Sequence, residues 1–265
     1  MLDIMNWFQA LILGLIQGLT EFLPVSSSGH LYLGRHFLGL DEAGLFLDTM
    51  LHVGTLIAVI TVYWREVLAL LLRPFSRMSL LLIIGTIPAL AVGFLFSDFF
   101  DSLAETGVTI GWEFLITGVV LWFSDNIKNQ GYKPVEKISY LDAFIIGVAQ
   151  ALAIFPAISR SGMTIAAALF RKVNKETAAY FSFLLSIPAI AAAIAYQSLK
   201  LFGGKAAAAV PLSTLIIGIV VSAISGYIAV RWMIATLKKG SLKGFAIYVW
   251  ILGLVILVAQ YLKVF

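Results

Sequence analysis

Residues 17–30 read Q-G-L-T-E-F-L-P-V-S-S-S-G-H and place a polar, glycine-bearing turn inside an otherwise apolar segment. Gln17 and Glu21 are four residues apart, so a helix through them has both side chains on one face. Pro24 ends that helix, because proline lacks an N–H group and restricts the residue before it. Residues 26–29 then supply serines and a glycine that begin a new helix. The stretch therefore predicts two half-helices that meet at a polar break.

The same pattern occurs again 133 residues later. The copies differ where polar chemistry would lie, since Glu21 corresponds to Ile154 and Ser27 corresponds to Arg160. The sequence therefore predicts two similar hairpins, of which the first supplies a carboxylate and the second a guanidinium. Ten of the 28 positions from 10 to 37 are identical in the second copy, namely Ala10/Ala143, Ile12/Ile145, Gly14/Gly147, Gln17/Gln150, Leu19/Leu152, Phe22/Phe155, Ser26/Ser159, Ser28/Ser161, Gly29/Gly162 and Phe37/Phe170.

These motifs resemble those of the undecaprenyl-diphosphate phosphatases, which are also called bacitracin-resistance proteins. The family pattern is a Glu or Gln, three residues and a Glu, followed by P-x-S-S-[ST]-G-H and later by P-G-x-S-R-S-x-x-T. In this chain the pattern falls on Gln17 and Glu21, on residues 24–30 and on residues 156–164. The resemblance covers nearly the whole chain, including F-S-F-L-L-S-I-P at residues 181–188.

The resemblance implies a membrane phosphatase that hydrolyses undecaprenyl diphosphate to undecaprenyl phosphate and inorganic phosphate. Such an enzyme recycles the carrier lipid of peptidoglycan synthesis in the bacterial plasma membrane and confers bacitracin resistance. It also implies a divalent cation, Mg²⁺ or Ca²⁺. The chain departs from the family pattern at Ala157, where a glycine is usual, and at Gln17, which is the uncharged choice and removes a possible metal-binding charge.

Composition independently indicates an integral membrane protein. Hydrophobic residues make up 61% of the 265 residues and charged residues only 12%, against about 25% charged in an ordinary soluble domain. A helix needs about 20 apolar residues to cross a bilayer. The two polar-broken segments fit re-entrant hairpins, so the predicted fold is an all-α polytopic membrane protein with six transmembrane helices and two re-entrant hairpins. The predicted spans are about 46–64, 79–97, 108–125, 177–198, 212–232 and 245–262.

Loop charges predict the orientation of these elements. Residues 97–109 form an acidic connection without any basic residue. Lys and Arg accumulate in short cytoplasmic loops, so we expect the acidic connection and both termini outside. The first hairpin then enters from outside and the second from inside, which predicts an inverted repeat with halves of about 1–125 and 134–265 and a site near the midplane. The basic connections carry Arg65, Arg73 and Arg77; Lys128, Lys133 and Lys137; Arg171, Lys172 and Lys175; and Arg231, Lys238, Lys239 and Lys243.

The turn residues predict an anion site. The first free N–H groups of a helix, together with hydroxyls, bind phosphate. An isolated S-S-S-G turn is more often a simple capped turn, but its duplication favours a pair of turns around a diphosphate. The expected substrate contacts are Gln17, Ser26, Ser28, Gly29, Ser159, Ser161 and Thr164.

Four residues are the candidate catalytic groups. Arg160 is expensive at membrane depth and suits bidentate binding of phosphate, although an ion pair with Glu21 is the alternative. Glu21, with Gln17, is expected to bind a divalent cation, to position water or to act as a base. His30 is the candidate general acid or base. Ser27 is either a nucleophile or a phosphate ligand.

Some alternatives stay open at the level of sequence. Asp48 and His52 form either a buried pair or part of the site, and Glu113 is expected to reach the membrane interface. A secondary transporter or flippase for an anionic lipid or solute is the rival function, because transporters also use inverted repeats with broken helices. Nucleic acid is excluded as a partner because the basic residues are scattered. The expected partners are a polyprenyl diphosphate and the bilayer, and homo-oligomerisation is undecided.

Overall fold

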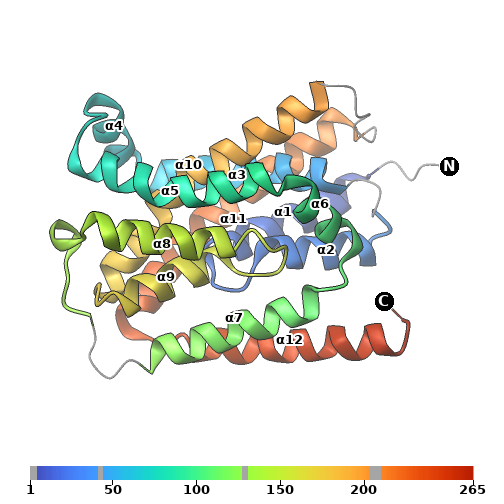
Figure 1. Cartoon of the computed structure of the whole chain (residues 1–265). Helices are drawn as coiled ribbons and strands as arrows, with labels where there is room; N and C mark the ends of the chain where they lie inside the picture. The colour runs from blue at the N-terminus through green and yellow to red at the C-terminus, as the bar shows by residue number, and fades with distance from the viewer. Residues whose placement is uncertain (1–4, 41–43, 127–130, 203–209, 265) are drawn as a thin grey trace.

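The protein is all-helical over residues 5–40, 44–126, 131–202 and 210–264, which a computed structural model describes (Figure 1). No strand occurs in these ranges, where the only β-type pairing is an isolated bridge between Lys133 and Val173. The α-helices are α1 (Trp7–Phe22), α2 (Ser27–Phe37), α3 (Gly44–Val62), α4 (Trp64–Leu72), α5 (Arg77–Leu95), α6 (Ser97–Thr106), α7 (Ile110–Asp125), α8 (Tyr140–Leu152), α9 (Arg160–Phe170), α10 (Lys175–Phe202), α11 (Leu212–Lys239) and α12 (Lys243–Tyr261).

The predicted membrane spans coincide with helices. Four of them, α5, α10, α11 and α12, are long and apolar enough to cross a bilayer unaided. The remaining two spans belong to bent pairs, in which α4 turns 86° from α3 and α7 turns 105° from α6. Counting each pair as one span gives up to six spans over the described residues. This confirms the expected all-α polytopic class.

The connection at residues 97–109, expected as a loop, is largely the helix α6. Asp98 lies in its first turn, where a carboxylate favours the helix dipole. Gly107 ends the helix with a φ of 64°, a left-handed conformation that glycine adopts without strain. The acidic connection is therefore an ordered helix.

Each hairpin is buried against a helix from the other half of the chain. α1 packs most extensively on α11, and α8 packs on α5. The two contacts use equivalent glycines: a Cβ on Gly14 would lie 2.6 Å from the Gly218 carbonyl oxygen, and one on Gly147 would lie 2.4 Å from the Gly85 carbonyl oxygen. Small residues allow such close approach of membrane helices. The break in the first hairpin lies inside the protein, because residues 21–27 are buried, as backbone outside a helix must be at membrane depth.

The charged connections separate along the bundle. In Figure 1 the α4–α5, α9–α10 and α11–α12 connections, which carry arginines and lysines, lie at the left-hand end. The helix α6 and the end of α12 lie toward the right-hand end. Of the basic residues that predicted the orientation, Lys128 falls outside the described residues. The inverted repeat itself stays a prediction.

Candidate active site

The two polar turns are built in the same way. The helix α1 ends at Phe22, and Ser26 caps α2 by accepting a hydrogen bond from the Gly29 amide at 3.4 Å. Ser159 caps α9 in the same manner, because its Oγ accepts from the Gly162 amide at 3.1 Å. Each capping serine lies two residues before a second serine, which is Ser28 in the first turn and Ser161 in the second. The serine caps expected from the sequence are therefore present in both hairpins.

Two serines join the turns to each other inside the protein. Ser26 Oγ donates to the carbonyl oxygen of Pro156 at 3.2 Å. In return, Ser161 Oγ donates to the carbonyl oxygen of Leu23 at 2.9 Å. These bonds link residues more than a hundred positions apart, so the two hairpin tips meet.

Glu21 lies at the centre of the meeting point and is buried. Arg160 Nη2 donates to Glu21 Oε1 at 2.6 Å. The other carboxylate oxygen, Oε2, accepts from Gln17 Nε2 at 2.9 Å and from the Ser27 hydroxyl. His52 Nε2 lies 3.4 Å from the same oxygen. The structure thus gathers Gln17, Glu21, Ser27 and Arg160, all of which the sequence proposed.

This arrangement has the parts of a nucleophilic site. The Ser27 hydroxyl already donates to a carboxylate, which is the geometry of a nucleophile and its base. Arg160 forms the ion pair with Glu21 that the sequence offered as an alternative, yet its Nη1 is buried without a hydrogen-bond partner in the described part of the chain. An incoming phosphate offers acceptors for both guanidinium nitrogens. Ion pairing at rest and phosphate binding are therefore compatible roles.

His52, which the sequence left undecided, belongs to this cluster. Its Nδ1 lies 2.6 Å from the Asp48 backbone carbonyl, which can only accept, so Nδ1 carries a proton. This contact aims Nε2 at Glu21. The Asp48 carboxylate pairs with Arg35 at 3.1 Å. The helical spacing of Asp48 and His52 was the only sequence signal that these residues lie next to Glu21.

His30 is directed elsewhere. Its Nδ1 lies 2.6 Å from the Ser26 carbonyl oxygen, and its Nε2 lies 2.7 Å from the Tyr248 hydroxyl. The ring stacks on Tyr248 and meets Phe114 edge-on. Both nitrogens are thereby engaged away from Glu21, so the structure does not bring His30 to the carboxylate. Its visible role is to hold Ser26, whose φ of 68° is unusual for a serine.

The predicted phosphate contacts divide into two groups. Ser28 is exposed and lines a cavity. Ser26, Ser159 and Ser161 instead hold the turns together, as described above. Gly29 allows the tips to approach, because a Cβ there would lie 2.6 Å from the Phe114 ring. Only Ser28 among these residues turns its side chain toward open space.

Thr164 lies farther from the cluster. Its hydroxyl bonds to Ser182 Oγ at 2.6 Å and to the Arg160 carbonyl oxygen at 2.8 Å. Ser182 belongs to α10, so Thr164 joins α9 to that helix. The structure therefore assigns this hydroxyl to helix packing rather than to the gathered group.

The helix α7 supplies residues that sequence reasoning missed. Glu113, expected at the membrane interface, is buried and accepts from the Ala157 amide and the Thr109 hydroxyl. Thr117 accepts from the Ser159 amide at 3.2 Å. The four-residue spacing of these three side chains on one helical face was a usable signal. Their contacts hold the backbone of the second turn just before α9 begins.

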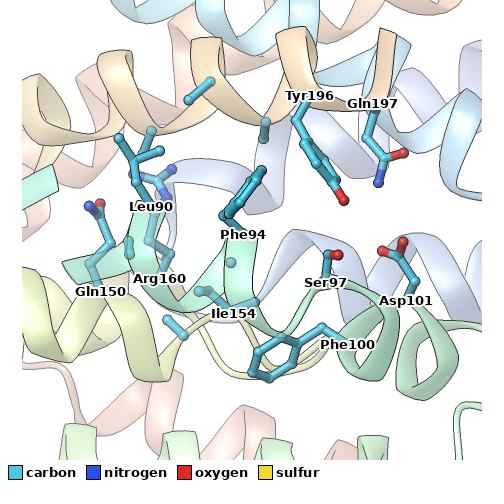
Figure 2. A pocket seen from close by; sticks show the side chains of 16 residues that line it. Leu90, Phe94, Ser97, Phe100, Asp101, Gln150, Ile154, Arg160, Tyr196 and Gln197 are labelled. Carbon is cyan, nitrogen blue, oxygen red and sulfur yellow. The ribbon is translucent and has the colours of Figure 1, made fainter. Parts of the chain in front are cut away.

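Two adjoining cavities reach the cluster. The apolar cavity, of about 480 Å³, lies between α5, α8 and α10 and includes Gln150 and Arg160 in its wall (Figure 2). The polar cavity, of about 260 Å³, is lined by Ser28, Arg35, Asp48 and His52 among others. The two share the wall residues Phe100, Asp101, Ile154, Ala193 and Gln197.

The divalent cation that the family resemblance implied would find few protein ligands at the site. Within the described ranges, no group of three or more His, Cys, Asp or Glu side chains could hold a metal ion. However, Gln17 Oε1 is buried without a hydrogen-bond partner next to Glu21. One carboxylate and one amide oxygen suit a hard cation that completes its shell with ligand oxygens and water. The donor set fits a cation bound together with a phosphate-bearing ligand.

Comparison with known proteins gives matches along almost the whole chain. Residues 10–255 match the family model described as bacitracin resistance protein BacA. Undecaprenyl-diphosphatase 4 of Bacillus thuringiensis (strain Al Hakam) is 61% identical over 261 residues, which cover 98% of this chain and 100% of that protein. The undecaprenyl-diphosphatase of Carboxydothermus hydrogenoformans is 52% identical over 258 residues, covering 97% and 98%. That of Halothermothrix orenii is 40% identical over 256 residues, covering 96% and 98%.

Proposed function

The chain belongs to the bacitracin resistance protein BacA family, and we infer from this membership and from the site that it is an undecaprenyl-diphosphatase. It removes the terminal phosphate of undecaprenyl diphosphate and leaves undecaprenyl phosphate and inorganic phosphate. The observation that carries this conclusion is the meeting of Arg160 with Glu21 and Ser27, which come from the tips of two separate hairpins.

The geometry supports Ser27 as the nucleophile. Its Oγ attacks the terminal phosphorus while its proton passes to Glu21, and the bond from that phosphorus to the bridging oxygen breaks. The bridging oxygen leaves on the lipid phosphate and takes up the proton. Water, deprotonated by Glu21, then attacks the phosphorus of the phosphoserine, the bond from phosphorus to Ser27 Oγ breaks, and Oγ takes the proton back from Glu21 as inorganic phosphate is released. Each step moves one proton through the same carboxylate.

Phosphoryl transfer is chiefly a positioning and electrostatic task. Arg160 leaves Glu21 for the terminal phosphate and places two N–H donors on it. Ser27 and Ser28 stand at the first positions of α2, where backbone N–H groups have no partner within the helix. Both sources of positive potential act beside the buried side chains of Glu21 and Ser27, where electrostatic interactions are stronger than in bulk water.

A divalent cation is part of this proposal. Glu21 and the Gln17 amide oxygen would hold it together with substrate oxygens. Such an ion, when bound, neutralises charge on the transferring phosphoryl group. The remaining chemistry belongs to Ser27, Glu21 and Arg160, as described above.

Purified protein with undecaprenyl diphosphate provides the direct test. Wild-type protein should release inorganic phosphate, whereas Ser27→Ala should release almost none and should form no phosphoserine detectable by mass spectrometry. Ser102→Ala, which changes an exposed serine of α6, is the matched control. Translocation of the lipid by wild-type protein without phosphate release would instead favour the rival transporter function.

We also propose that the site opens to the outer face of the plasma membrane. The support is the acidic helix α6 in the wall of both cavities, where Phe100 and Asp101 line each of them. The chain lacks cysteine, so single cysteines are clean probes. In intact cells an impermeant thiol reagent should label Ser102→Cys and Ser28→Cys and spare Lys238→Cys. Labelling of Lys238→Cys but not of Ser102→Cys would show that the protein has the opposite orientation.

A further inference from the structure

Two buried polar atoms without partners lie in the wall of the apolar cavity. Gln150 is 2% exposed, and its Oε1 has no hydrogen-bond partner in the part of the chain that the structure describes. Arg160 Nη1 is in the same condition. Figure 2 shows both side chains at the same end of the cavity, near Leu90. A buried polar atom without a hydrogen-bond partner is unfavourable, so the presence of two such atoms in one cavity indicates that a ligand binds there.

The chemistry of the two atoms differs. Gln150 Nε2 donates to the Gly85 carbonyl oxygen at 3.4 Å. Reversing the amide would set its oxygen against that carbonyl, so Oε1 is the atom left for a ligand, and it can only accept. Arg160 can only donate. The site therefore fits a ligand that offers both a hydroxyl donor and a charged acceptor.

Most of the remaining wall is apolar, and its polar residues Ser97, Asp101, Tyr196 and Gln197 lie toward the end away from Gln150 (Figure 2). Leu90 and Phe94 of α5 face Ala189 and Ala192 of α10 across it. A ligand with its small polar end at Gln150 and Arg160 thus fits the apolar part of the cavity with a hydrocarbon chain. A free inorganic anion would leave the larger part of the cavity unfilled.

We propose that Gln150 and Arg160 form a subsite for the monophosphate of a prenyl lipid, with the P–OH donating to Gln150, an oxyanion accepting from Arg160, and the chain lying along α5 and α10. This inference rests on the proposed function, because the ligand is the product of that reaction. Burial favours the singly charged form of a phosphate monoester, which keeps one hydroxyl. The inner phosphate of the diphosphate substrate has no such hydroxyl, so it cannot make this contact with Gln150.

The headgroup contact is tested by calorimetric titration of farnesyl phosphate into detergent-solubilised protein. Gln150→Leu should weaken binding about tenfold, as expected for loss of one hydrogen bond to a charged group. Gln260→Leu is the matched control, because Gln260 also donates to a glycine carbonyl, Gly107 at 3.1 Å, but lies outside the cavity. Gln150→Glu keeps the size and the acceptor and adds a repelling charge, so it should also weaken binding. Unchanged affinity in both Gln150 variants would overturn the subsite.

The chain contact is tested separately. Ala192→Phe narrows the cavity and should weaken farnesyl phosphate severalfold without changing the affinity for inorganic phosphate. Ala195→Phe, on the exposed side of the same helix, is its control. Equal loss with both variants would exclude the cavity as the chain site.

Binding and catalysis are scored independently in these experiments. Phosphate release from undecaprenyl diphosphate is followed in parallel for each preparation. Wild-type protein that binds farnesyl phosphate through Gln150 but releases no phosphate would refute the proposed function and leave the subsite in place. If wild-type protein released phosphate but the Gln150 variants bound farnesyl phosphate as tightly as it does, the subsite alone would be refuted.

Discussion

The two hairpins are alike at their bases and different at their tips. Asn6 and Gln9 form a capping box that starts α1, and Ser139 and Asp142 form the equivalent box that starts α8. The third position of each box also closes its hairpin. Gln9 Nε2 donates to the Leu38 carbonyl oxygen at 3.1 Å, whereas Asp142 accepts from Arg171 Nε at 2.7 Å.

The tips share their capping serines but not their reactive groups. The first tip carries Glu21 and Ser27, and the second carries Arg160 and an isoleucine at the position that corresponds to Glu21. A symmetric pair of tips would place two carboxylates or two arginines together, which is unfavourable without a counter-charge. Because the two tips differ at these positions, Glu21 and Arg160 form a neutral ion pair. We expect a bound phosphate to replace the carboxylate as the partner of Arg160.

Replacing the arginine of the second tip should have the largest effect. Arg160→Ala should lower kcat by about 10³-fold, since it removes both donors to the transferring phosphate. Arg160→Lys should recover little, because an ammonium cannot reproduce the planar fork. Phosphate release measures both. Arg171→Ala, at the far end of the same helix, should keep turnover per folded molecule, and near-normal turnover of Arg160→Ala would remove this residue from the site.

The carboxylate of the first tip should come next. Glu21→Gln should lower kcat by about 10²-fold, because Ser27 loses its base. It should also weaken any dependence on added Mg²⁺ or Ca²⁺, while Gln17→Glu should strengthen it. Cation titrations of both variants provide the measurement. The control is Glu113→Gln, whose amide oxygen can still accept from the Ala157 amide; an unchanged cation response in Glu21→Gln would exclude the carboxylate as ligand.

Sequence reasoning was most successful where a local pattern determines local structure. The break at Pro24, the caps at Ser26 and Ser159 and the apolar spans all depend on neighbours in the chain, and the structure has them as expected. The ion pair of Arg160 with Glu21, which the sequence offered as the alternative to phosphate binding, is also present, because a buried arginine needs a partner.

Contacts made by other helices could not be read in the same way. His30 follows the serine turn directly in sequence, but Tyr248 of α12 holds its ring away from Glu21. His52 is far from the motif in sequence and lies against Glu21. Helix packing, which the sequence does not show directly, decides that His52 and not His30 contacts this carboxylate, and the catalytic role of His30 stays a prediction.

Replacing His52 should have a smaller effect, and it tests whether this histidine supports Glu21. His52→Leu should lower kcat about tenfold without a matching change in KM, since Glu21 loses one of its hydrogen-bond donors. His52→Gln should restore most of the activity, because its amide can donate to the same oxygen. Steady-state kinetics of phosphate release separate kcat from KM. Equal losses in both variants would indicate that His52 only fills space.

The smallest effect concerns the hairpin bases. Asp142 lies outside the spans, is buried, and accepts from Ser139, Arg171 and Lys133. Burial raises its pKa, but the hydrogen bonds from Ser139, Arg171 and Lys133 lower it more, so the pKa lies below the ordinary value for aspartate. Asp142→Asn should therefore reduce the free energy of unfolding by about 2 kcal/mol at neutral pH, without changing turnover per folded molecule.

The pH dependence of stability distinguishes the base of the first hairpin from the base of the second. A carboxylate with a lowered folded-state pKa stabilises the protein fully above its unfolded pKa of about 4, and this stabilisation is lost as the pH falls toward the folded-state value. Thermal unfolding in detergent should therefore show wild-type protein and Asp142→Asn converging as the pH falls below about 4. Gln9→Leu, the equivalent change in the first hairpin, should cost about 1 kcal/mol at every pH, because a neutral amide does not titrate. A constant gap for Asp142→Asn across this range would mean that its ion pairs contribute nothing to stability, and the two bases would then be equivalent in energy as well as in geometry.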